Sequence, residues 1–285
     1  MSTRQRFRNL FRNPPVDTPD ACPQNDAPVE FPYYLRLGAW RLHPHWVLEA
    51  LAYALGFQIY LALRRRSGDP IASPLRWSVI AAATAGAAVG SKILYWFEDP
   101  WQTLERWPDP AYLMAGKTIV GGLIGGLIAV EWAKRHLGIR TRTGDLFAIP
   151  LAVGTAVGRV GCFLTGLDDH TFGTPTTLPW GVDFGDGIAR HPTQLYEVAF
   201  LLLLAGFLWR RSLRPYENGD LFKMFMVGYM GFRLLVDFFK PGVTVAGLSL
   251  LQWACVGVLL YYARDVRRWM VGQGTNWITG YTDGT

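Results

Sequence analysis

The sequence has little of what soluble or disulfide-stabilised domains are built from. Charged residues make up only 18% of its 285 residues, and three of the residues are cysteines. No two cysteines are close in sequence, so their spacing gives no sign of a disulfide framework or a zinc site. The glycine-rich run 121–126 lacks the lysine that a phosphate-binding loop requires. We therefore expect no cofactor and no metal.

The sequence does contain long hydrophobic stretches. About seven stretches are nearly free of charge, and each has roughly the length that crosses a bilayer core of about 30 Å. They lie near residues 45–63, 77–97, 111–133, 145–165, 192–209, 220–240 and 247–263. Tryptophan and tyrosine are frequent near their ends, as in the aromatic belts at headgroup depth. The pattern predicts an all-α polytopic membrane protein with about seven transmembrane helices.

The basic residues are concentrated in alternate loops between the hydrophobic stretches. Loops after the first, third, fifth and seventh stretches are rich in arginine and lysine, whereas the loops 98–110 and 166–190 are mainly acidic. This asymmetry predicts a cytoplasmic C-terminus and a periplasmic N-terminus. The net charge of +6 therefore reflects topology, and we expect no nucleic-acid partner. We expect a polar, partly disordered N-terminal tail (1–34), a seven-helix transmembrane domain (35–268) and a C-terminal tail (269–285).

Several ionisable residues lie within the hydrophobic stretches, where each costs roughly 2.5–3.5 kcal/mol and so needs a partner or a function. The densest set shares one face of the sixth stretch, at steps of four, four and three: Tyr229, Arg233, Asp237 and Lys240. This polar stripe either lines a cavity or is an Arg–Asp pair that neutralises itself within one helix.

Other stretches add to this set. Arg159 has no acidic residue within one helical turn, so it needs a distant carboxylate or an anionic ligand, and a guanidinium suits phosphate. His191, Gln194 and Glu197 repeat every three residues at the start of the fifth stretch. Glu49, Lys92 and Lys117 complete the set. Together these groups favour an anionic lipid headgroup that enters sideways, although a secondary transporter stays open.

Four ordered motifs resemble those of prolipoprotein diacylglyceryl transferases. They are Gly-Gly-Leu-Ile-Gly at 121–125, Gly-Arg-Val-Gly-Cys-Phe at 158–163, His-Pro-Thr-Gln-Leu-Tyr-Glu at 191–197, and the stripe at 229–240. The resemblance covers about residues 35–265. It implies a seven-helix enzyme of the bacterial inner membrane. Such an enzyme moves diacylglyceryl from phosphatidylglycerol, or a similar anionic phospholipid, to a cysteine thiol of a lipoprotein precursor, with release of glycerol 1-phosphate.

The resemblance also assigns roles by position. It implies that Arg159 and Arg233 hold the donor phosphate and that Tyr229 is functional. Asp237 stands where the family usually has Glu, and Lys240 and Lys92 stand where it usually has Arg. The catalytic residues expected are His191, Tyr229, Arg233 and Arg159. Those expected to bind substrate are Arg159, Arg233, Asp237, Lys240, Gln194, Glu197, Lys92, Gly121 and Gly122.

The sequence departs from the family pattern at two motifs. Val120 replaces a histidine, and Cys162, Thr165 and Leu167 replace asparagine, asparagine and glutamate. The remaining candidates for a general base are His191, His170 and Glu197, of which we favour His191 because imidazole titrates near neutral pH. We take Cys162 as an inert buried thiol. The acceptor is then a lipoprotein precursor or another periplasmic molecule (a glycan, lipid or small molecule), and the alternative of another class is a non-catalytic lipid transporter.

Overall fold

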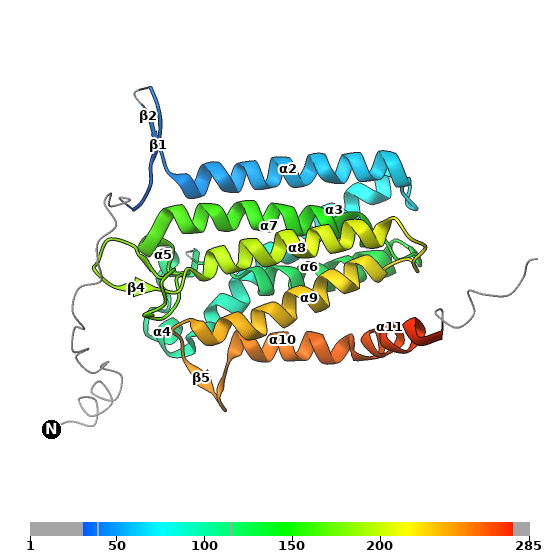
Figure 1. Ribbon diagram of the computed structural model, residues 1–285. Helices are drawn as coiled ribbons and strands as arrows, with labels where there is room; N and C mark the ends of the chain where they lie inside the picture. Colours follow the sequence, from blue (N-terminus) through cyan, green and yellow to red (C-terminus); the bar gives the residue numbers. More distant parts are fainter. Residues whose placement is uncertain (1–30, 39, 115, 276–285) are drawn as a thin grey trace, which may run out of the picture.

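The computed structural model describes residues 31–38, 40–114 and 116–275. The predicted N-terminal tail therefore lies almost wholly outside the described residues, as do residues 276–285. Long helices run side by side along the molecule, and short hairpins and helices gather at one end (Figure 1). We call this the hairpin end and the opposite one the basic end, because arginines or lysines occupy the last turns of α2, α6 and α8 there.

Each predicted stretch overlaps one long helix, although the helix within 111–133 begins only at residue 119 and the helix within 220–240 ends at residue 236. These helices are α2 (Pro44–Ser67), α3 (Ser73–Glu98), α6 (Ile119–His136), α7 (Asp145–Thr165), α8 (Thr193–Ser212), α9 (Asp220–Val236) and α10 (Leu250–Tyr261). The shorter elements are α4 (Pro100–Glu105), α5 (Pro110–Met114), η1 (Gly166–Asp169) and η2 (Asp237–Phe239). The helix α11 (Ala263–Thr275) overlaps the segment that we expected to be a C-terminal tail.

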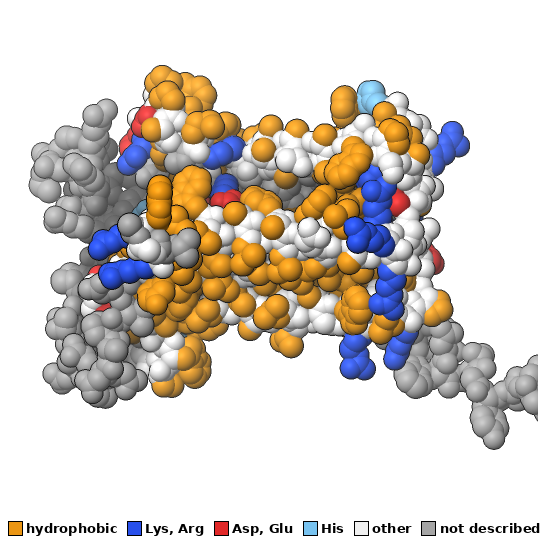
Figure 2. All heavy atoms as spheres, turned by 90° about the horizontal axis from the view of Figure 1, so that it is seen from above, with side chains coloured by type: hydrophobic (Ala, Val, Ile, Leu, Met, Phe, Trp, Pro, Cys, Tyr) orange, Lys and Arg blue, Asp and Glu red, His pale blue; other side chains and the backbone are white. Residues whose placement is uncertain are grey.

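The protein is a helical membrane protein. Among the residues that the structure describes, three helical segments are long and apolar enough to cross a bilayer: α2, α3 and the run Asp145–Asp169 that joins α7 to η1. Figure 2 shows a wide band of hydrophobic side chains on one face, with lysine and arginine toward its two ends. An apolar girdle between charged ends is the surface that a bilayer requires.

Three two-stranded antiparallel hairpins close the hairpin end. They pair β1 (Leu35–Leu37) with β2 (Trp40–Leu42), β3 (Val182–Asp183) with β4 (Ala189–Arg190), and β5 (Thr244–Val245) with β6 (Leu248–Ser249). In the first, Leu35 faces Leu42 and Leu37 faces Trp40. The third leads directly into α10, which Ser249 and Gln252 begin with a reciprocal capping box.

Small residues bring two pairs of helices into close contact. A methyl group on Gly121 of α6 would lie 2.4 Å from the carbonyl oxygen of Gly90 in α3, so only glycine fits there. A methyl on Gly161 of α7 would lie 3.1 Å from Leu48 Cβ in α2. The sequence therefore sets an α3–α6 pair and an α2–α7 pair, as small-residue spacing does in membrane helices. The core lies mainly among α7, α8 and α9.

Candidate active site

A buried carboxylate brings together side chains from three helices. Glu197 of α8 is 0% exposed. Its Oε1 accepts a hydrogen bond of 2.5 Å from the Tyr229 hydroxyl on α9. Its Oε2 lies 2.9 Å from Arg159 Nε on α7 and 3.2 Å from Arg233 Nη1 on α9. We call these four residues the Glu197 cluster. Two guanidinium charges against one carboxylate leave an excess positive charge, which favours an anionic ligand beside it.

The predicted stripe on α9 continues from this cluster to the end of the helix. Arg233 Nη2 donates to Asp237 Oδ1 at 3.3 Å, and Asp237 Oδ2 accepts from Ser249 Oγ at 2.6 Å. The side chain of Gln252 donates to the carbonyl of Leu234 at 2.9 Å, so it fastens α10 to α9. The predicted Arg–Asp pair thus exists, although α9 ends at Val236 and Asp237 is the first residue of η2. Both members of the pair also line a cavity.

That cavity has a volume of about 2820 Å³ and runs between the α3–α6 pair and the helices α2, α7 and α9. It is large enough for the headgroup and part of the chains of a phospholipid. The predicted site residues along it are Arg159, Arg233, Asp237, Lys240, Lys92 and Gly122. Lys92 donates to the carbonyl of Gly116 at 2.6 Å, which fixes the turn before α6.

Four other predicted residues lie behind the cavity wall. Glu197 and Tyr229 are fully buried in the Glu197 cluster, and Gly121 packs against α3. Gln194 is 1% exposed, and its amide makes no hydrogen bond with the residues that the structure describes. None of these four residues is part of the lining that a ligand in the cavity would contact.

The favoured base, His191, also lies apart from the cavity lining. Its Nδ1 is 3.2 Å from the Tyr196 hydroxyl, and its ring packs against Phe239 with centroids 4.9 Å apart. A part in proton transfer would therefore require a substrate that reaches beyond the cavity, or a movement of this loop.

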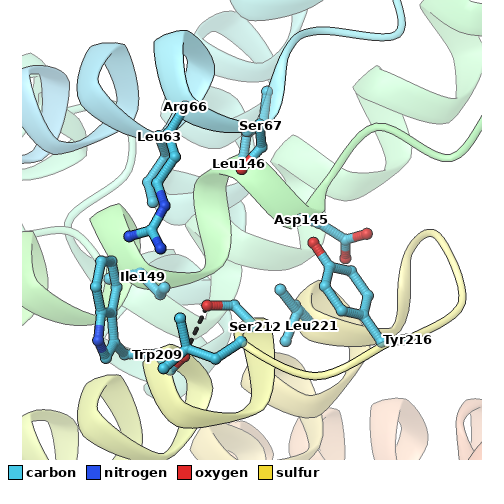
Figure 3. A pocket seen from close by; sticks show the side chains of 11 residues that line it. Leu63, Arg66, Ser67, Asp145, Leu146, Ile149, Trp209, Ser212, Tyr216 and Leu221 are labelled. Carbon is cyan, nitrogen blue, oxygen red and sulfur yellow. Dashed lines mark hydrogen bonds between the residues drawn. The ribbon is translucent and has the colours of Figure 1, made fainter.

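A second, small cavity lies at the basic end. It has a volume of about 60 Å³, and Figure 3 shows Arg66, Trp209 and Tyr216 around it. Asp145 lines it as well, but its carboxylate accepts the backbone N–H groups of Gly219 and Phe222 at 2.5 and 3.0 Å. That carboxylate therefore serves the start of α9, and the cavity is too small for a lipid.

The family model described as prolipoprotein diacylglyceryl transferase matches residues 32–263, most of the chain. This chain belongs to that family. Three relatives are each named phosphatidylglycerol–prolipoprotein diacylglyceryl transferase. The Bordetella bronchiseptica protein is 34% identical over 80% of this chain and 91% of its own. The Polynucleobacter asymbioticus protein is 30% identical over 83% and 95%, and the Nitrosomonas europaea protein 28% over 75% and 84%.

This member of the prolipoprotein diacylglyceryl transferase family has no histidine at the start of α6. Val120 is 0% exposed there and belongs to the apolar core, so the position offers no base and no hydrogen-bonding group. Any base for this family's chemistry must come from another element.

A second polar cluster lies on the other side of Arg159. His45 at the start of α2 places its Nδ1 3.1 Å from Asp169 Oδ1, while Arg159 Nη1 contacts the sulfur of Cys162 at 3.8 Å. We call His45, Cys162 and Asp169 the His45 cluster, and all three line the large cavity. The sequence predicts that Cys162 is an inert buried thiol, and its one signal for His45 is the predicted topology, which starts the first stretch and ends the fourth at the same membrane surface.

Proposed function

We propose that the protein transfers diacylglyceryl from phosphatidylglycerol to the cysteine thiol of a lipoprotein precursor and releases glycerol 1-phosphate. The observation that carries this proposal is the meeting of Arg159 and Arg233 beside a cavity of lipid size. The family and the printed names of its relatives support the donor and the acceptor.

The charges of the Glu197 cluster suit an anionic headgroup. Arg159 and Arg233 contribute two positive charges, and Glu197 contributes one negative charge. Lys240 lines the same cavity with a further positive charge, and Asp237 and Glu98 line it with negative ones. In a site that excludes water, such fixed charges stabilise an anion far more than they do in water.

The proposed reaction is a displacement at carbon. The thiolate sulfur of the acceptor attacks the glyceryl carbon of the diacylglycerol part, a C–S bond forms, and the C–O bond to phosphate breaks. The electron pair of that bond stays on the phosphate oxygen, so the leaving group gains a second negative charge. Arg159, Arg233 and Lys240 are placed to stabilise that charge. Tyr229 acts as a positioning residue, because its hydroxyl holds Glu197.

The proposal includes the topology expected from the sequence. Seven crossings, with a periplasmic N-terminus and a cytoplasmic C-terminus, would place the hairpin end at the periplasmic surface of the inner membrane. Support comes from the helices found at all seven predicted stretches and from the basic last turns of α2, α6 and α8 at one end. Phosphatidylglycerol would then enter sideways from the outer leaflet.

The decisive experiment uses purified protein, labelled phosphatidylglycerol and a synthetic peptide with a lipoprotein cysteine. Mass spectrometry should show the peptide gaining one diacylglyceryl group as glycerol 1-phosphate appears. Arg159→Ala should lower the rate about 10²–10³-fold, the effect of losing one donor to a developing anion. Arg210→Ala, at the exposed end of α8, is the matched control and should keep the rate.

Two outcomes would contradict the proposal. If lipid turns over while the peptide stays unmodified, the acceptor is not a lipoprotein cysteine. If Arg159→Ala and the unaltered protein turn lipid over at equal rates, Arg159 does not hold the phosphate.

A further inference from the structure

The His45 cluster combines the three side-chain types that bind zinc most often, an imidazole, a thiol and a carboxylate. One donor atom from each residue lies within 4.8 Å of the other two. We propose that His45, Cys162 and Asp169 bind a zinc-type divalent cation and leave a fourth coordination position open to the large cavity. This arrangement of three protein ligands and one open position is typical of reactive rather than structural zinc sites.

The distances fit such an ion after small side-chain movements. Zinc bonds of about 2.0–2.3 Å in a tetrahedron put neighbouring donor atoms roughly 3.5 Å apart. His45 Nδ1 and Asp169 Oδ1 are 3.1 Å apart, and the sulfur is within 4.8 Å of both. His45 Nδ1 is also buried and makes no hydrogen bond of normal geometry with the residues that the structure describes.

The surroundings orient each ligand as metal sites require. A metal-bound histidine usually directs its other ring nitrogen to a carboxylate, which fixes its orientation. His45 Nε2 lies 3.4 Å from Glu49 Oε2, and Lys117 pairs with that carboxylate in turn. Thr171 Oγ1 donates to Asp169 Oδ2 at 2.6 Å. That bond leaves Oδ1, the oxygen next to His45, for the ion.

The charges balance as well. A thiolate at Cys162 and the carboxylate of Asp169 together neutralise a divalent cation. Arg159 Nη1 lies 3.8 Å from this sulfur. The charge of Arg159 is itself paired with Glu197, so it does not repel the ion unopposed.

The three ligands sit on elements with fixed relative positions. The helices α7 and α2 pack closely at Gly161, where a methyl group added to the glycine would lie 3.4 Å from His45 Cα. This contact sets His45 beside the next residue of α7, Cys162. Asp169 follows in η1, directly after α7. The site is therefore built from a helix–helix contact and one short turn. Such a support is rigid, and precise metal coordination needs rigid ligand positions.

The open position gives the site a role if the proposed function holds. An acceptor thiol that binds there would become a stronger acid through coordination and would release its proton to solvent water, so that no nearby base is needed. The sulfur of this thiol would lie on the same side of Arg159 as Cys162. It would therefore be next to Arg159 and Arg233, which hold the phosphate in the proposed function. This step rests on the proposed function, whereas the metal site does not. It would also account for a transferase with Val120 in place of the family's histidine.

The test measures metal in the full-length protein carrying Cys22→Ser, so that this thiol does not contribute. After incubation with zinc and desalting, about one zinc ion per chain should remain. With cobalt in its place, a thiolate-to-cobalt absorption band should appear in the near ultraviolet. Cys162→Ala should remove the band, and His45→Gln and Asp169→Asn should release the metal. The matched controls Cys255→Ala, His43→Gln and Asp168→Asn should keep both signals.

A second measurement needs no change at the site. Zinc at about 100 times its dissociation constant should slow iodoacetamide alkylation of Cys162 about 100-fold, because only the free fraction reacts. No retained metal in the unaltered protein, metal retention that survives Cys162→Ala, or alkylation indifferent to zinc would each overturn the site.

The same protein separates this inference from the proposed function. Zinc binding by a protein that modifies no peptide supports the site and removes the transfer reaction. Peptide modification at the same rate after complete zinc removal supports the transferase and overturns the role of the ion in activating the acceptor.

Discussion

The two sides of Arg159 face two different polar clusters. On one side its Nε meets Glu197 in a cluster where Glu197 is 0% and Arg159 only 6% exposed. On the other side its Nη1 meets Cys162, in a cluster that lines the cavity. We call the Glu197 cluster closed, because Glu197 and Tyr229 lie behind the cavity wall and only its two arginines line the cavity. We call the His45 cluster open, because all three of its residues line the cavity. The closed cluster holds the two arginines in place, whereas a ligand in the cavity can reach every residue of the open one.

The largest expected effect comes from removing the charge at the centre of the closed cluster. Glu197→Gln leaves Arg159 and Arg233 buried without their shared carboxylate, which should cost about 3–5 kcal/mol of unfolding free energy. Thermal unfolding in detergent measures this loss. Phosphatidylglycerol should restore more stability to the variant than to the unaltered protein, because its phosphate supplies the missing negative charge.

The matched control is Glu131→Gln on α6, where a carboxylate pairs with Lys134 at 2.9 Å but is 48% exposed. Its effect should stay within about 0.5 kcal/mol, as for most surface changes. Equal stability of Glu197→Gln and Glu131→Gln would mean that the Glu197 cluster is not closed, and the comparison would fail.

Two tyrosines sharpen the comparison, since each donates a hydrogen bond to a carboxylate. Tyr229 donates to Glu197 at 2.5 Å in the closed cluster, and Tyr53 donates to Glu49 at 3.2 Å behind the open one. Tyr229→Phe should cost about 1.5–3 kcal/mol, the range for hydrogen bonds to charged groups. Tyr53→Phe, at a residue 71% exposed, should cost less than about 0.5 kcal/mol in the same unfolding measurement. Similar losses in both variants would argue against the difference in burial as the cause.

The contacts within one helix were predictable from the sequence, and those across helices were not. The steps from Tyr229 to Arg233 and Asp237 give one helical face directly, and the structure has the Arg–Asp pair. That Arg159 and Arg233 share Glu197 depends on how three helices pack, which periodicity does not encode. The His45 cluster was missed for the same reason.

The third predicted stretch shows a different limit. Its apolar pattern continues through 111–133, yet α5 ends at Met114 and α6 begins only at Ile119. Gly116 has φ of 49°, and Lys92 from α3 donates to its carbonyl at 2.6 Å. A tertiary hydrogen bond thus stabilises a turn at Gly116, where hydropathy predicts a continuous helix.

Adjacent glycines test which side of α6 faces the cavity. Gly121→Ala places a methyl 2.4 Å from the carbonyl oxygen of Gly90 and should cost about 1–3 kcal/mol through overpacking. Gly122 faces the cavity, and its new methyl would meet its nearest atom only at 3.6 Å. Gly122→Ala should therefore change stability by less than about 0.5 kcal/mol and alter lipid binding instead. Thermal unfolding and a phosphatidylglycerol binding assay separate the two variants. A larger loss of stability in Gly122→Ala than in Gly121→Ala would contradict the assignment of Gly122 to the cavity and of Gly121 to the contact with α3.

The smallest expected effect lies at the surface, in the loop that closes the hairpin end. Arg190 holds Asp186 with two hydrogen bonds, of 2.6 and 2.7 Å, and these outweigh partial burial and keep the pKa of the Asp186 carboxyl below its usual range. A lowered pKa stabilises the fold above the ordinary aspartate value of about 3.9 and ceases to do so as the pH falls through the lowered value. Asp186→Asn should therefore cost only about 0.2–1 kcal/mol at neutral pH, because solvent screens an exposed pair. Unfolding curves of the variant and the unaltered protein should converge in acid below that pH, whereas a difference that persists there would show that the carboxylate charge is not what Arg190 recognises.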